Sequence, residues 1–240
     1  MTAVVISQPM LFPWPGFFEQ MKLAEVYLWL DDTQFSKGSF SNRIKVNVDG
    51  VGKWLTIPLM KKGSFQSINE LQEASDFRST HMMMIKTAFK GAPFAREAIQ
   101  IAEEVYTNTN ICDLLIASAE VPARWLSLGP DQKRAKTSSL GVDGKSWQRV
   151  LDLVKFVDGT IYITGHGAAG YLDHTAFEMS GVHVEYMNYS KMAWPQKADD
   201  FNPYVSILEL IAQTGPEAIN YLKPMTIPWA EFTRQRIGNP

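Results

Sequence analysis

The chain has 240 residues, 45% of them hydrophobic and 20% charged, a composition that supports a buried core and excludes intrinsic disorder. Its formal net charge of −2 differs from the basic balance of domains that bind the phosphate backbone, so we expect no nucleic-acid partner. One cysteine, Cys112, excludes a disulfide framework, and no apolar run reaches the ~18 residues of a membrane span, so we expect a cytoplasmic protein without such a span.

The first elements are a strand, a loop, a helix and a second strand. Residues 3–7 form a β-branched run that ends at Gln8-Pro9, and residues 26–30 form an apolar run that ends at Asp31-Asp32. Between them, residues 17–24 carry apolar side chains at helical spacing. A helix between two strands makes the strands parallel neighbours with a right-handed crossover, and ligands bind such sheets where a strand ends and a helix begins.

A hairpin and a helical section come next. Residues 41–48 alternate between polar and apolar side chains, Asp49-Gly50 supplies a turn, and residues 53–58 return. Helical spacing then predicts helices at 68–71, 78–90, 94–102 and 111–117.

The last third returns to alternating strands and helices. The pattern predicts a strand edge or loop at 136–140, an amphipathic helix at 146–156 and a buried strand at 160–164. A glycine turn onto a helix start follows at 165–170, then an edge strand at 181–186 and a last helix at 205–212 before a Pro-rich tail. We therefore predict one α/β domain over residues 1–240. Its parallel sheet is of Rossmann-like or nucleotidyltransferase-like type, with a hairpin insert at about 40–60 and a helical section at about 66–127.

The densest cluster of candidate binding residues lies in the first loop. Prolines, aromatic residues and a glycine stand between the first strand and the first helix, and Gly16 would let backbone N–H groups approach an anionic ligand. The alternative is that the aromatic residues plug the end of the sheet. The candidate ligand contacts are Gln8, Pro9, Phe12, Trp14 and Gly16.

Two further groups of charged residues follow. Asp31 and Asp32 could hold a metal, orient an amine or act as a base, because adjacent like charges raise one carboxyl pKa; the alternative is a cap or a solvated strand end. Cations and an amide gather at the hairpin, where an arginine can bind a phosphate or carboxylate bidentately or simply face solvent: Lys37, Asn42, Arg43 and Lys45.

His166 follows a predicted strand and lies between glycines, where an imidazole can reach a ligand and titrate near neutrality. It is a candidate catalytic residue, and a loop histidine bonded to the backbone is the alternative. The neighbouring candidates for binding are Gly165, Gly167, Gly170 and Tyr171. The histidines and the one cysteine have no metal-ligand spacing, so we predict no metal site.

Several motifs resemble those of the WbqC-like family. They are the run from Ile6 to Phe18, the run from Leu30 to Lys37, the hairpin motifs at 42–45 and 54–58, and the later motifs at 165, 170–173 and 201–210. The resemblance covers nearly the whole chain. Because the family is associated with O-antigen and other surface-polysaccharide gene clusters, it implies a role in making or decorating sugars.

A second resemblance concerns pantothenate synthetase and related nucleotidyltransferases. In pantothenate synthetase a Thr-Gln-Phe follows the second strand, and Thr33-Gln34-Phe35 matches it, which adds Gln34 to the candidate binding residues. The His-x-Gly-His motif of that group is missing here, so the resemblance supports a fold-level analogy alone.

The leading hypothesis is a transferase that places an acyl or aminoacyl group on the amine of a nucleotide-linked amino sugar. Asp31 or Asp32 would be the base, and Arg43 and Lys45 the phosphate contacts. If the nucleotidyltransferase analogy holds, ATP would activate the donor as an adenylate; the other candidate is an acyl donor such as acyl-CoA or an acyl carrier protein. The alternative is a non-catalytic protein that binds a sugar nucleotide or a carrier protein and assists a pathway enzyme.

Overall fold

The main sheet of this computed structural model, which describes residues 1–36, 40–60, 65–198 and 200–237, has six strands in the order β5-β2-β1-β6-β7-β8. All neighbours pair in parallel except β7 and β8. The strands are β1 (Ala3–Ser7), β2 (Val26–Trp29), β5 (Lys133–Lys136), β6 (Ile161–Thr164), β7 (His183–Met187) and β8 (Thr226–Pro228).

The chain winds outward from β1 in both directions. It passes through α1 (Pro15–Leu23) to β2 and later to β5, then crosses through α5 (Ser146–Phe156) to β6, on the other side of β1, and through α6 (His174–Met179) to β7. The predicted Rossmann-like α/β fold class is confirmed. The direction of winding reverses between β1 and β6, which makes their carboxyl ends the topological switch point.

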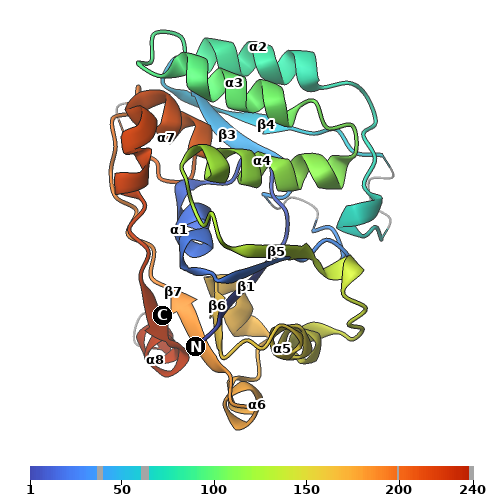
Figure 1. Ribbon diagram of the computed structural model, residues 1–240. Coiled ribbons are helices and arrows are strands. Elements are labelled where there is room, and N and C mark those ends of the chain that lie inside the picture. The colour runs from blue at the N-terminus through green and yellow to red at the C-terminus, as the bar shows by residue number, and fades with distance from the viewer. Residues whose placement is uncertain (37–39, 61–64, 199, 238–240) are drawn as a thin grey trace.

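Two cores lie on the two faces of this sheet. Val5, Tyr27 and Ile163 pack in one core and Val4, Leu28 and Tyr162 in the other, because successive side chains of a strand point to opposite faces. In Figure 1, α1 and α4 (Ile111–Trp125) lie above the sheet, whereas α5, α6 and α8 (Trp229–Ile237) lie below it.

A third block stands on the first core. It contains the hairpin of β3 (Arg43–Val48) and β4 (Val51–Thr56) with α2 (Arg78–Ala88), α3 (Ala95–Val105) and α7 (Ile207–Thr214), at the top of Figure 1. The predicted hairpin and helical section are confirmed. Asp49 and Gly50 have φ of 52° and 78°, as a two-residue turn with a primed geometry requires.

Short 3₁₀ helices complete the chain: η1 (Ile68–Glu70), η2 (Thr137–Ser139), η3 (His166–Gly170) and η4 (Gly215–Tyr221). Residues 136–140, expected to be a strand edge or loop, divide between the last residue of β5 and η2. The glycine turn was expected to lead directly onto a helix start. The structure differs, because the turn forms η3 and α6 begins only at His174.

The C-terminal prediction was wrong in two respects. The Pro-rich tail contains β8 and α8, and because β8 pairs with β7, the strand predicted at the edge lies inside the sheet. α8 is held by aromatic packing: the Phe232 ring stacks on Tyr186 at 4.0 Å, and the Trp229 ring stacks on His174 at 4.7 Å. These are tertiary contacts, so local periodicity does not reveal them.

Candidate functional site

The carboxyl ends of five parallel strands meet at one edge of the sheet. The segments that leave this edge are residues 8–16, 30–34, 137–139, 165–170 and 188–191. The first loop and the glycine turn at 165–170 flank the switch point between β1 and β6. Ligands of open α/β sheets bind at this place, so this edge is the candidate site.

Asp31 and Asp32 are both engaged in contacts with other elements. Asp31 is 1% exposed, and its carboxylate accepts hydrogen bonds from the Ser138 N–H at 3.0 Å and the Ser138 hydroxyl at 2.7 Å. Asp32 accepts from the Thr137 hydroxyl at 2.7 Å and forms a bidentate ion pair with Arg149 at 3.0 and 2.5 Å. The two carboxylates therefore tie the loop after β2 to η2 and α5.

The ion pair also sets the protonation of Asp32. Burial alone would raise the pKa of this carboxyl, but the hydrogen bonds from Arg149 and Thr137 outweigh burial and hold the pKa below its usual range. Asp32 is therefore a charged partner of Arg149 and a weak proton acceptor near neutral pH.

The first loop presents fewer ligand contacts than its composition suggests. Phe12 is completely buried, packs edge-on against Tyr106 at 5.6 Å and has a φ of 37°. The Trp14 ring folds back over Gly16, where a Cβ would lie 2.1 Å from a ring atom. The absence of a side chain at Gly16 therefore leaves space for the Trp14 ring. Phe12 is part of the hydrophobic core.

Gln8 and Gln34 lie where β1 and β2 end. The Gln8 amide donates to the Thr33 hydroxyl at 3.1 Å, and Pro9 is buried. Gln34 is exposed and forms an antiparallel bridge with Ser67, which brings η1 over the end of β2. Both glutamines therefore belong to the same edge as the aspartates.

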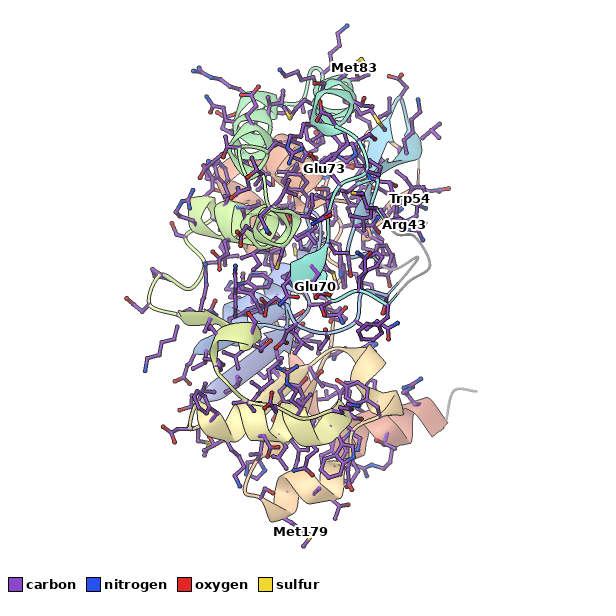
Figure 2. All side chains as sticks on the ribbon, turned by 90° about the vertical axis from the view of Figure 1, so that its right-hand side faces the viewer. Arg43, Trp54, Glu70, Glu73, Met83 and Met179 are labelled. Atoms are coloured by element: carbon purple, nitrogen blue, oxygen red, sulfur yellow. The ribbon has the colours of Figure 1, made fainter. Side chains whose placement is uncertain are left out.

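The hairpin brings its cations to an exposed tryptophan. The Arg43 guanidinium lies 4.5 Å and the Lys45 ammonium 5.1 Å from the centre of the Trp54 ring, and Figure 2 shows Arg43 and Trp54 close together. Such cation–π contacts hold both cations at the hairpin surface. Asn42 instead closes the hairpin, donating to a backbone carbonyl at 2.9 Å, and Lys37 lies outside the described residues.

The hairpin is anchored beside the first loop. The Leu11 N–H donates to the Ser41 carbonyl at 2.9 Å, and the Ser206 N–H donates to the Lys45 carbonyl at 3.1 Å. The start of β3 therefore lies near the switch point.

His166 is exposed, and its ring is oriented by the end of β7. Its Nε2–H donates to the Met187 carbonyl at 2.7 Å, which leaves Nδ1 as the acceptor in the neutral ring. The ring packs against Tyr189 at 5.3 Å and Phe232 at 4.9 Å. Among the described residues, none forms a hydrogen bond with Nδ1. The bond to the backbone that we gave as the alternative is present, but it uses only Nε2 and leaves Nδ1 able to accept a proton.

The glycines near His166 differ in their surroundings. A Cβ on Gly165 would lie 3.2 Å from the Tyr189 hydroxyl, so a larger residue there would press on that tyrosine. Gly167 and Gly170 have open space where a side chain would be, and Tyr171 is 44% exposed.

Several contacts at this edge involve residues to which the sequence patterns did not point. Arg149 lies on the polar side of the amphipathic helix α5. The hydrophobic periodicity of a helix does not distinguish an ion-paired arginine from a solvated one. Tyr189 and Lys191 lie in a segment without periodicity, and Tyr204 belongs to the motif at 201–210, which did not mark it as a site residue. Only the tertiary fold brings these residues to the site.

Within residues 1–36, 40–60, 65–198 and 200–237, no three or more histidine, cysteine, aspartate or glutamate side chains gather as a metal ion would require. In the same ranges, no helix combines the length and apolarity needed to cross a membrane.

Comparisons with known proteins identify relatives of the chain. The model of the WbqC-like protein family matches residues 8–221. The protein named "Uncharacterized protein Rv1507c" from Mycobacterium tuberculosis (strain ATCC 25618 / H37Rv) is 29% identical, over 93% of this chain and 98% of its own length. No solved structure matches the chain significantly.

Proposed function

This chain belongs to the WbqC-like protein family, and we propose that it is a cytoplasmic transferase of surface-polysaccharide biosynthesis that acylates or aminoacylates the amine of a nucleotide-linked amino sugar. The family resemblance supports the sugar pathway. The arrangement at the switch point supports a ligand site at the carboxyl edge, with the acyl donor and the amino sugar as its two occupants.

The observation that carries a catalytic role is the orientation of His166. Its Nε2–H is bonded to the Met187 carbonyl, so Nδ1 can take a proton from the substrate ammonium. The amine nitrogen then bonds to the carbonyl carbon of the donor, and the bond to the leaving group breaks. The leaving group is the thiolate of CoA or of a carrier protein, or AMP from an adenylate. The second proton of the nitrogen passes to the thiolate or, with AMP, to solvent.

The charged residues take separate roles in this proposal. Arg43 and Lys45 bind the pyrophosphate of the sugar nucleotide, since guanidinium and ammonium groups form charge-assisted hydrogen bonds to phosphate. Asp31 and Asp32 were the bases expected from the sequence, but both accept hydrogen bonds from neighbouring elements. We therefore assign the base to His166 and give the aspartates the role of fixing the loop after β2.

The second candidate function is binding without catalysis. Both aspartate carboxylates accept hydrogen bonds from neighbouring elements, so His166 is left as the one general base in the proposed transferase. This observation favours binding without catalysis. A protein that presents a sugar nucleotide or a carrier to a partner enzyme needs the binding residues and no base. The two functions differ in whether a product forms.

Thermal-shift screening with amino-sugar nucleotides, ATP and acyl donors, followed by mass spectrometry of the mixtures, separates them. Saturation at a hundredfold excess over Kd stabilises the fold by about 2.7 kcal/mol.

His166→Gln should lower turnover about 10²–10⁴-fold and leave the thermal shift on ligand binding unchanged. His183→Gln is the matched control, since His183 is exposed at the opposite end of β7. Equal turnover in both variants would contradict the assigned base, and shifts without any product would favour the binding protein.

A further inference from the structure

Three aromatic rings, which we call the aromatic row, lie beside His166. The Trp14 ring lies 4.8 Å from Tyr189 and 5.1 Å from Tyr204, with the planes inclined by 59° and 49°. His166 contacts the Tyr189 end of the row at 5.3 Å, and the Lys191 ammonium lies 5.3 Å from the centre of the Tyr204 ring. The row thus has an imidazole at one end and a cation at the other.

A buried carboxylate holds the segment that carries half of this arrangement. Glu19, on α1, is 2% exposed and accepts hydrogen bonds from the Ser190 hydroxyl at 2.5 Å and the Lys223 N–H at 3.3 Å. Ser190 lies between Tyr189 and Lys191, and Lys191 has a φ of 46°, which non-glycine residues rarely adopt. Backbone strain of this kind persists only where surrounding contacts enforce it.

A buried hydrogen-bond donor near the row has no partner within the described part of the chain. Trp194 is 5% exposed, and its indole N–H has no hydrogen-bond partner among the described residues. Trp194 lines a cavity of about 10 Å³ together with Trp14, Glu19 and Lys191. A buried donor without a partner is costly, so a water or a ligand oxygen bonded to this N–H would be stabilised.

The two ends of the row face different parts of the proposed site. Tyr204 lies two residues before Ser206, whose N–H is bonded to the Lys45 carbonyl, so the backbone of β3 passes near the Tyr204 end, and the Lys191 ammonium lies at that same end. His166 lies at the other end. A nucleotide-linked amino sugar has the same order of groups, with the pyrophosphate at the anomeric carbon and the amine elsewhere on the ring.

We propose that the aromatic row binds the sugar ring of the substrate and that Lys191 binds its anomeric phosphate, so that the sugar amine faces His166. This inference rests on the proposed function. Aromatic rings pack well on the apolar C–H face of a sugar, and the row offers three of them at inclined angles: Tyr204 is 43% exposed, and Trp14 and Tyr189 are half-buried. The ammonium of Lys191 supplies a charge-assisted hydrogen bond to the phosphate.

Calorimetric titration of the full chain with glucosamine 1-phosphate, glucosamine and inorganic phosphate tests the inference. Lys191→Gln should weaken binding of glucosamine 1-phosphate at least tenfold and leave the affinity for glucosamine unchanged. Tyr189→Leu should weaken both sugars and leave inorganic phosphate unchanged. Lys155→Gln, at an exposed position on α5, is the matched control and should bind like the wild type.

The outcomes separate this inference from the function on which it rests. Wild-type affinities in both Lys191→Gln and Tyr189→Leu would overturn the sugar subsite, and a transferase product formed by the same variants at the wild-type rate would leave the proposed function standing. If the wild-type chain binds neither sugar phosphate nor amino-sugar nucleotide, both the subsite and the function fail. Lys191 is exposed, so Lys191→Gln should fold, and its melting temperature serves to check this.

Discussion

His81, on α2, points toward the end of the hairpin and has both ring nitrogens hydrogen-bonded. Its Nε2–H donates to the Thr56 carbonyl at 3.2 Å, and Nδ1 accepts from the Tyr106 hydroxyl at 2.9 Å. The side chain is 3% exposed. Burial lowers the pKa of His81 to about 4, since a protonated ring would lose the acceptor that Tyr106 requires and would place a charge in the core.

The stability of the protein should therefore fall on mild acidification. The folded pKa is below the unfolded value of about 6.5, so the unfolded chain binds the proton more tightly and stability is lost as pH drops from about 6.5 to 4. Between pH 7 and pH 5, His81 alone should cost about 2 kcal/mol of unfolding free energy, measured by urea titration. His81→Gln should be less stable at pH 7 but have a flatter pH profile. An unchanged profile would show that other groups cause the acid sensitivity.

At the level of elements, the predictable parts are those with strong local patterns. The β-branched run at 3–7 and the apolar run at 26–30 became paired strands, and the Asp49-Gly50 turn marked the hairpin. β5 was missed in part because its sequence, Lys-Arg-Ala-Lys, is polar and lacks strand propensity; pairing with β2 determines its conformation.

The candidate site was predictable in position but only partly in detail. The order of strands and helices brings the first loop, the aspartates and the glycine turn to one edge, since parallel strands end on the same side. The contacts of these residues depend on partners far away in the chain. Asp32 and Arg149 are 117 positions apart, and Trp14 meets Tyr189 and Tyr204 only after the sheet has formed.

The Asp32–Arg149 pair links α5 to the loop after β2, and its removal should have a structural cost. The two side chains are 22% and 13% exposed, so Asp32→Asn leaves a largely buried guanidinium without its charged partner and should lower the free energy of unfolding by about 3 kcal/mol. Arg124→Ala is the matched control: its pair with Glu104 is 65% and 54% exposed and should contribute less than about 1 kcal/mol. Equal, small losses in both variants would contradict a structural role for Asp32.

At the scale of the whole molecule, the switch point lies where separately stabilised layers meet. The first loop packs into the core shared with α4 and the hairpin block, whereas the face below the sheet is covered by α5, α6 and α8. His166 touches both sides, through Tyr189 toward the first loop and through Phe232 toward α8. The ring that we assign as the base is therefore positioned by Tyr189, which packs against the first core, and by Phe232, which belongs to the second.

Phe232 should accordingly affect both stability and the site. It is 5% exposed and contacts Tyr186 and His166, so Phe232→Ala should cost about 3–5 kcal/mol of unfolding free energy and increase hydrogen exchange in β7 and β8. Met179→Ala removes a side chain that is 85% exposed, at the lower end of Figure 2, and should change neither quantity. Because the substrate contacts that we propose lie on the Tyr189 side of the imidazole, loss of the Phe232 ring from the other side should also reduce turnover more than ligand affinity. If the β7 amides of Phe232→Ala exchange hydrogen at the wild-type rate, α8 does not stabilise β7 and β8.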